Sequence, residues 1–192
     1  MTILPLRHIG DPVLRAATRP VARDELASAD TQRFIDDLVE TKRAANGAGL
    51  AANQVGDARR IAVVEIEPGN PRYPYKPPFP LAVLVNPRIA SASDELITIN
   101  EGCLSVPGLR GEVARSAEVV VEYEDRDGES QRLTVAGLTA GTFQHEIDHL
   151  DGVLFVDRVS DARTFATWEM YERHLRPAFE QHARELVARY GS

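Results

Sequence analysis

The sequence predicts an α+β fold in which antiparallel or mixed β-sheets pack around a central helix, with a further helix at the C-terminus. Three features support this prediction. Short runs of β-branched residues alternate with turn residues, as expected for strands. Asp127 and Gly128 separate two such runs, which is a typical hairpin signal. Apolar residues recur at helical spacing in residues 138–150 and again near the end of the chain.

The size and composition of the chain fit one ordinary globular domain. With 192 residues, 43% of them hydrophobic, we expect residues 1–192 to form a single domain with a helical tail at 162–192. No apolar run reaches the roughly 18 residues of a membrane span, and the start resembles no secretion signal, so we expect a cytoplasmic protein without a membrane partner. The net charge of -7 argues against specific nucleic-acid recognition. The single cysteine excludes an internal disulfide.

The first half of the chain predicts a turn, a helix and two strands. Glycine and proline in residues 9–15 indicate the turn. The helix is expected to run from Asp30, as N-cap, to Asn46 and Gly47, with one buried apolar stripe. Residues 61–66 and 81–85 predict strands. Residues 68–80 between them hold six of the twelve prolines, so we expect an excursion over the surface.

The second half predicts further strands and two helical regions. Strand signals occur at 94–99 and 113–123, and the hairpin follows. Residues 138–150 predict the central helix, which Gly152 ends. Gly141 within this helix costs roughly 1 kcal/mol relative to alanine, so we expect another group to pack closely there. The tail is expected to be helical from Asp161, with Pro177 as a break or restart.

The central helix carries an HExxH motif. His145 and His149 are four residues apart, so they project from one face toward a single metal ion, and Glu146 lies beside them to handle protons.

A catalytic site of this kind needs a third ligand, and the sequence offers alternatives. The pattern that places a third histidine after Gly152 fails, because Phe155 occupies that position. Glu169 or Glu172 downstream could serve. We favour Cys103, since one thiolate and two imidazoles leave a fourth position open for water.

Two other stretches have both a structural and a functional interpretation. Gly47 to Gln54 is either a tight connection or a close-approach segment in which the Gln54 amide faces a developing oxyanion. Glu101, two residues before the cysteine, either pairs with Arg110 or Arg115 to brace the loop, or these charges are solvated at the surface.

Three blocks together resemble the peptide deformylase family: GxGLAAxQ at Gly47 to Gln54, EGCLS at Glu101 to Ser105, and QHExDHLxG at Gln144 to Gly152. The resemblance extends from the turn at Gly10 to the segment around Arg158, and the tail beyond Arg163 resembles the family least. One departure is Ala48, where many members carry an isoleucine or valine that borders the substrate.

The resemblance implies a hydrolase that removes the formyl group from the N-terminal methionine of newly made chains and releases formate. It implies Cys103, His145 and His149 as ligands of one divalent metal ion. Fe2+ is the leading candidate, and Zn2+, Ni2+ or Co2+ can occupy the same site. Glu146 would be the general base and acid, and Gln54 with the backbone N–H of Leu104 would hold the oxyanion.

The expected substrate contacts lie in two places. Gly47, Ala48, Gly49 and Gly102 are expected to accept the extended peptide backbone. Leu138 and Thr142 are expected to border a pocket for the methionine side chain, a hypothesis motivated by Gly141 and by the small residues opposite the metal. Formyl-methionyl nascent peptides, and with them the ribosome, are the partners considered.

Two other functions remain open from the sequence. An HExxH peptidase would use Glu169 or Glu172 as the third ligand and would keep its metal without Cys103. A non-catalytic relative that binds nascent chains or ribosomes would tolerate loss of Glu146.

Overall fold

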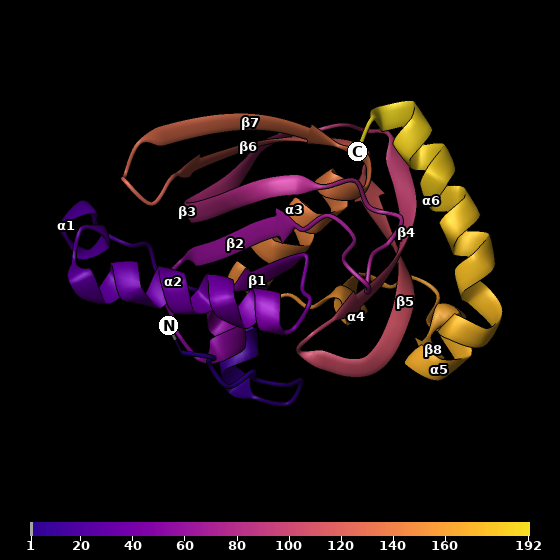
Figure 1. The fold of residues 1–192 in the computed structure, drawn as a ribbon, viewed down its shortest axis with the longest axis horizontal. Helices are drawn as coiled ribbons and strands as arrows, with labels where there is room; N and C mark the ends of the chain where they lie inside the picture. Colours follow the sequence, from indigo (N-terminus) through magenta and orange to yellow (C-terminus); the bar gives the residue numbers. More distant parts are fainter. Residues whose placement is uncertain (1) are drawn as a thin grey trace.

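The computed structural model describes residues 2–192 and contains two antiparallel sheets with helices between and beside them (Figure 1). One sheet has five strands in the order β1-β2-β3-β6-β7, and the other has three in the order β4-β5-β8. The strands are β1 Gly49–Ala51, β2 Ile61–Ile66, β3 Phe79–Ala92, β4 Leu96–Cys103, β5 Val106–Ser116, β6 Glu118–Glu124, β7 Ser130–Ala136 and β8 Ala166–Thr167. Neighbouring strands pair antiparallel throughout both sheets, so the antiparallel form of the prediction is confirmed.

The helices surround and separate these sheets. They are α1 Arg23–Leu26, α2 Ala29–Ala44, α3 Gly137–Leu150, α4 Phe155–Arg158, α5 Trp168–Met170 and α6 Arg176–Tyr190. Single turns of 3-10 helix occur at Pro12–Arg15, Ala52–Val55 and Ala162–Thr164, and a π-helical turn, Tyr171–Leu175, joins α5 to α6. No helix within residues 2–192 is both long and apolar enough to cross a lipid bilayer.

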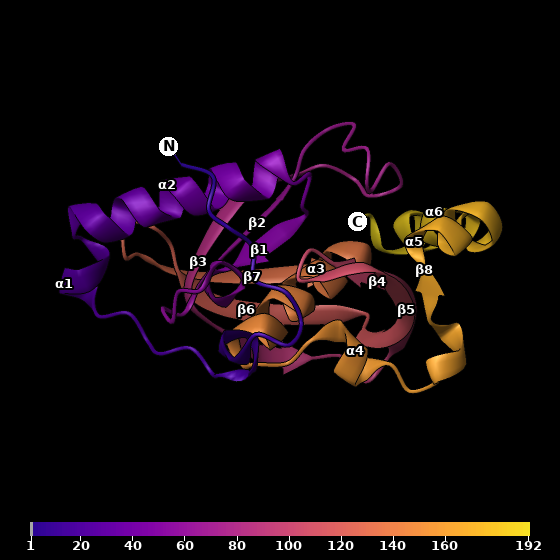
Figure 2. The same ribbon diagram turned by 90° about the horizontal axis from the view of Figure 1, so that it is seen from below.

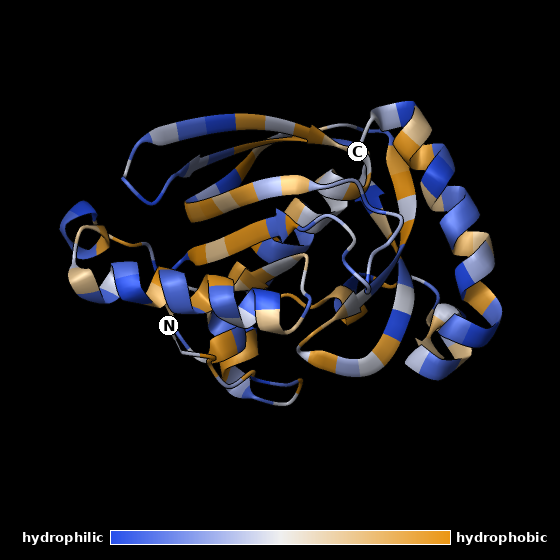
Figure 3. Ribbon diagram, in the orientation of Figure 1, coloured by the Kyte–Doolittle hydropathy of each residue, from blue (hydrophilic) through white to orange (hydrophobic). Residues whose placement is uncertain are grey.

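Strand β2 is covered on both faces, which explains its nearly continuous run of hydrophobic residues (Figure 3). Successive side chains of a strand point to opposite faces. Ile61 and Val63 pack with α2 residues, whereas Val64 packs with α3 residues. The five-stranded sheet therefore lies between α2 and α3.

Helix α3 occupies the centre of the molecule. Phe143 and Ile147 pack on the five-stranded sheet, and Leu138 packs with Ile99 of β4 and Leu186 of α6. Thirteen of its fourteen residues are buried. Gly141 faces Ile99 so closely that an added Cβ would overlap its Cδ1 atom, which confirms the expected close packing.

Several element boundaries differ from those predicted. Helix α2 begins after Ser28, whose hydroxyl accepts from the Thr31 N–H at 3.2 Å, so Asp30 is not the N-cap. Strand β3 is longer than the predicted 81–85, because it continues past Pro87 with irregular register against β6. The predicted strand at 113–123 is two strands, interrupted at Ala117, that belong to different sheets.

The tail is only partly helical. Residues 161–167 form a 3-10 turn and the short strand β8, which pairs with Leu109 and Arg110 of β5. Pro177 stands in the first turn of α6, in agreement with a restart. Figure 1 shows α6 running alongside β4 and β5.

Candidate active site

Three metal-ligating side chains meet between α3 and the end of β4. The ligand atoms of Cys103, His145 and His149 all lie within 4.8 Å of one another, with Cys103 Sγ 3.1 Å from His149 Nε2. The two histidines share a helix face because they are four residues apart. Cys103 joins them because β4 ends beside this face. A thiolate and two imidazoles suit a divalent transition metal, so the donor set fits one ion.

Cys103 and His145 each favour the charged form of the other. Burial opposes ionisation of Cys103, but the charge of His149 and hydrogen bonds from both imidazoles hold the pKa of this thiol well below its ordinary value. Burial also disfavours the charged form of His145, but hydrogen bonds to Cys103 and Glu101 hold the pKa of His145 well above its ordinary value. The thiolate is the form that binds metal.

Glu146 lies beside Cys103, His145 and His149, which we call the ligand group, and has a free carboxylate oxygen. The residue is 4% exposed, and its Oε2 atom is buried with no hydrogen-bond partner among residues 2–192. Burial raises the pKa of the carboxyl. Gly49 of β1 leaves the room for this carboxylate, since a Cβ at that position would overlap its Oε1 atom. The backbone of β1 thus passes directly against a candidate proton acceptor.

A buried ion-pair network orients His145. Glu101 accepts from His145 Nδ1 at 2.8 Å, and Arg115 donates to both oxygens of Glu101 at 2.8 and 3.0 Å. Arg115 also pairs with Asp148 of α3, which in turn pairs with Arg158 at 2.6 Å. Such outer partners fix the orientation of a ligating imidazole. Of the two arginines considered from the sequence, Arg115 braces Glu101.

Gln54 reaches the same centre from the turn after β1. Its Nε2 atom donates to Ser105 Oγ at 3.1 Å and lies 3.5 Å from Cys103 Sγ, while its Oε1 atom accepts from the Ala51 N–H at 2.8 Å. These contacts hold the amide next to the thiol, with its nitrogen facing both Ser105 Oγ and Cys103 Sγ.

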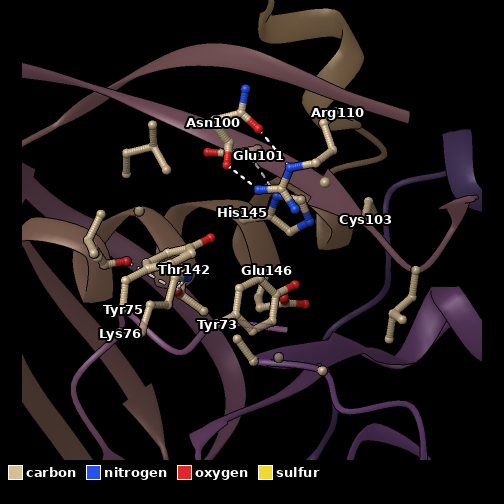
Figure 4. Close-up of a pocket in the computed structure, with 18 of the residues that line it drawn as sticks. Tyr73, Tyr75, Lys76, Asn100, Glu101, Cys103, Arg110, Thr142, His145 and Glu146 are labelled. Carbon is tan, nitrogen blue, oxygen red and sulfur yellow. Dashed lines mark hydrogen bonds and ion pairs between the residues drawn. The ribbon is translucent and has the colours of Figure 1, made fainter. Parts of the chain in front are cut away.

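One pocket brings most of the predicted site residues together (Figure 4). The predicted residues that line it are Gly47, Ala48, Gly49, Gln54, Gly102, Cys103, Leu104, Leu138, Thr142, His145 and Glu146. His149 does not line the pocket; it is fully buried behind Cys103.

Other residues of the pocket wall were not predicted. The residues that were not predicted to line the pocket are Tyr73, Tyr75, Lys76, Ile99, Asn100, Glu101, Arg110 and Gly141. The first three belong to the proline-rich segment that was predicted only as a surface excursion. One signal was available there: the chain has twenty arginines but only two lysines, Lys42 and Lys76.

The downstream glutamates lie apart from this site. Glu169 is exposed and pairs with Arg173 at 2.9 Å, and Glu172 pairs with Arg176 at 2.6 Å. Among residues 2–192 the ligand group that includes the two histidines of the motif contains Cys103 and neither glutamate.

The chain resembles known deformylases over most of its length. The family model described as polypeptide deformylase matches residues 3–165. Peptide deformylase 2 of a Nostoc species is 44% identical over 170 residues, which is 88% of this chain and 93% of that protein. The peptide deformylase of Rhizobium meliloti is 44% identical over 161 residues, covering 83% of this chain and 87% of that protein.

Solved structures show the same similarity. A Met-Ala-Ser-bound class I type b peptide deformylase from Acinetobacter baumannii has a TM-score of 0.79 and 40% identity, and covers 82% of this chain and 99% of its own. A peptide deformylase from Thermotoga maritima has a TM-score of 0.73 and 35% identity. The match covers 84% of this chain and 100% of the Thermotoga chain.

Proposed function

Because the chain belongs to the polypeptide deformylase family and removes the N-formyl group from nascent peptides, we propose how its own residues carry out this hydrolysis. The observation that carries the proposal is the meeting of three ligand atoms and the unpartnered Glu146 carboxylate at one pocket.

Cys103, His145 and His149 hold a single divalent ion in this proposal, with Fe2+ as the first candidate and Zn2+, Ni2+ or Co2+ as alternatives for the same ligands. When bound, such an ion makes water easier to deprotonate and polarises a carbonyl oxygen. The unbroken chain of contacts from His145 through Glu101 to Arg115 supports the assignment, since it keeps His145 Nε2 turned toward the other two ligands.

Glu146 is the proton carrier. Its free Oε2 atom accepts a proton from the attacking water and later delivers it to the amide nitrogen as the C–N bond breaks, which releases formate and a free amine. The raised pKa caused by burial suits this exchange, because a more basic carboxylate takes the proton more readily near neutral pH. Gln54 Nε2 and the Leu104 N–H donate to the carbonyl oxygen as negative charge develops on it.

The peptide lies in extended form along Gly47 to Gly49 and Gly102, and the first side chain enters the part of the pocket bordered by Ala48, Leu138 and Thr142. The bound Met-Ala-Ser of the related structure supports an N-terminal peptide as the occupant. As parts of the same proposal, residues 1–192 form one catalytic domain with 162–192 as its tail, and the enzyme acts in the cytoplasm on chains leaving the ribosome.

The test measures formate release from formyl-Met-Ala-Ser by anaerobically purified protein, with metal analysis of the same sample. We expect Cys103→Ser to lose the metal. We expect Glu146→Gln to keep the metal and lose about 100-fold or more in kcat. Full activity of Cys103→Ser would show that a different ligand set operates.

A further inference from the structure

Lys76 lines the candidate active-site pocket, and it comes from the proline-rich segment between β2 and β3. Figure 2 shows this segment extending from the sheet toward α6. Tyr75 packs edge-to-face on Phe179 of α6, with ring centroids 5.2 Å apart, and the Asn70 side chain donates to the Asn46 carbonyl at 3.2 Å. The segment is therefore held by contacts at two points, and Lys76 directly follows one of them, Tyr75.

The Lys76 ammonium is seated on α3 inside the pocket. Its Nζ atom donates to Thr142 Oγ1 at 2.7 Å and lies 4.9 Å from the centroid of the Tyr73 ring (Figure 4). An ammonium has three N–H donors, and no second hydrogen-bond acceptor for it occurs among the residues that the structure describes. The end of the pocket formed by Ile99, Leu138 and Gly141 thus contains a charged donor with unused capacity.

This donor lies against α3 about one helical turn before Glu146. Thr142 precedes Glu146 by four residues on α3, which is about 6 Å along the helix. Leu138, a further turn back, and Ile99 complete this end of the pocket. If the formyl group lies at Glu146, the first side chain extends toward Thr142 and the ammonium.

We propose that Lys76 is a specificity-determining residue of the deformylation reaction. Its ammonium, positioned by Thr142, makes the site favour N-formyl residues whose side chain ends in a hydrogen-bond acceptor at methionine length. Methionine sulfoxide, with a strong acceptor oxygen, is favoured most relative to norleucine, which has the same length and no acceptor. This inference rests on the proposed function and adds a substrate class to it.

The experiment compares kcat/KM for formyl-norleucyl-Ala-Ser and for its methionine sulfoxide counterpart. In Lys76→Met the sulfoxide-to-norleucine ratio should fall about tenfold, as expected for loss of a charged hydrogen bond, while norleucine turnover persists. Arg88→Met, which removes an exposed cation of β3, is the matched control and should leave the ratio unchanged.

A ratio that is the same in Lys76→Met and in the unmodified enzyme would overturn the inference while leaving deformylation intact. Absence of formate release by the unmodified enzyme from any formylated peptide would instead overturn the proposed function. If Lys76→Met does not fold, Thr142→Val takes its place, because it removes the hydroxyl that positions the ammonium and should lower the same ratio.

Discussion

Gly49 and Glu146 constrain each other at the level of single atoms. The carboxylate lies where a Cβ on Gly49 would be, so the strand backbone and the proposed proton carrier occupy neighbouring space. Glu146 is a long side chain that could move aside, and the fold would then survive such a substitution. The role of Gly49 is thus to keep the carboxylate in place, not to permit an unusual backbone conformation.

We therefore expect Gly49→Ala to fold with little loss of stability and to lose activity. Displacement of a catalytic group by about 1 Å can cost on the order of 100-fold in rate. The measurement is kcat on formyl-Met-Ala-Ser, with metal content and thermal midpoint determined on the same protein. Ala92→Gly, at an exposed position of β3 outside the pocket, is the control. Unchanged kcat in Gly49→Ala would show that the carboxylate does not need its present position.

Residue-level prediction reached furthest where proximity follows from spacing along one element. Helical spacing predicted that His145 and His149 share a face, and Cys103, the single thiol, was the preferred third ligand; the structure brings the ligand atoms of these three residues within 4.8 Å of one another. Lys76 could not be found in this way. Its place in the pocket depends on how the proline-rich segment folds back onto α3, which is a long-range property that local sequence does not encode.

At the scale of elements, Glu65 joins β2 to α2. It accepts from Lys42 Nζ at 2.6 Å and from Arg43 at 2.8 and 2.9 Å, and its side chain is 12% exposed. The hydrogen bond from Arg43 is the largest cause that holds the pKa of Glu65 down to about 2, from an ordinary value of 4.5, against the opposing effect of burial. Lys42 is fully buried, so this carboxylate is its counterion.

A depressed pKa gives a definite pH dependence of stability. The contribution of Glu65 is complete above about pH 4.5 and is lost as the pH falls toward about 2, by roughly 3 kcal/mol over that range. We expect the free energy of unfolding of Glu65→Gln to fall less steeply with acid than that of the unmodified protein. Denaturant titrations at several pH values provide the measurement, with the exposed Glu118→Gln as control. Equal slopes for Glu65→Gln and the unmodified protein would contradict the assignment.

Prediction of elements was accurate where one periodicity governs the whole element. The strand at 61–66 was predicted with its observed bounds, because β-branched residues occupy four of its six positions, including both ends. Alternation in 113–123 could not show that the chain passes from one sheet to the other at Ala117, since both strands share the same period. Strand β3 extends beyond the predicted 81–85 on both sides and includes Pro80 and Pro87, where its register is irregular.

At the scale of the whole molecule, α6 of the tail packs against residues that form the pocket wall. Leu138 and Ile99, which line the pocket, belong to the same hydrophobic cluster as Ala183 and Leu186 of α6. The start of α3 has no side-chain cap, and the Ser192 carbonyl instead accepts from the Leu138 N–H at 3.0 Å. The family match ends at residue 165, so this support comes from a part of the chain that the family model does not cover.

Detaching α6 should therefore affect substrate binding as well as stability. Leu186 is 6% exposed, and we expect Leu186→Asp to lower the free energy of unfolding by at least about 3 kcal/mol, because a charge replaces a packed side chain. KM for formyl-Met-Ala-Ser should rise more than kcat falls, since the pocket wall loosens while the ligand group and Glu146 keep their own supports. Leu175→Asp, at a tail position that is 42% exposed, is the matched control and should change stability by no more than about 0.5 kcal/mol. Thermal unfolding and steady-state kinetics on both variants measure these effects, and a destabilised Leu186→Asp with unaltered KM would mean that the pocket holds its shape without the tail.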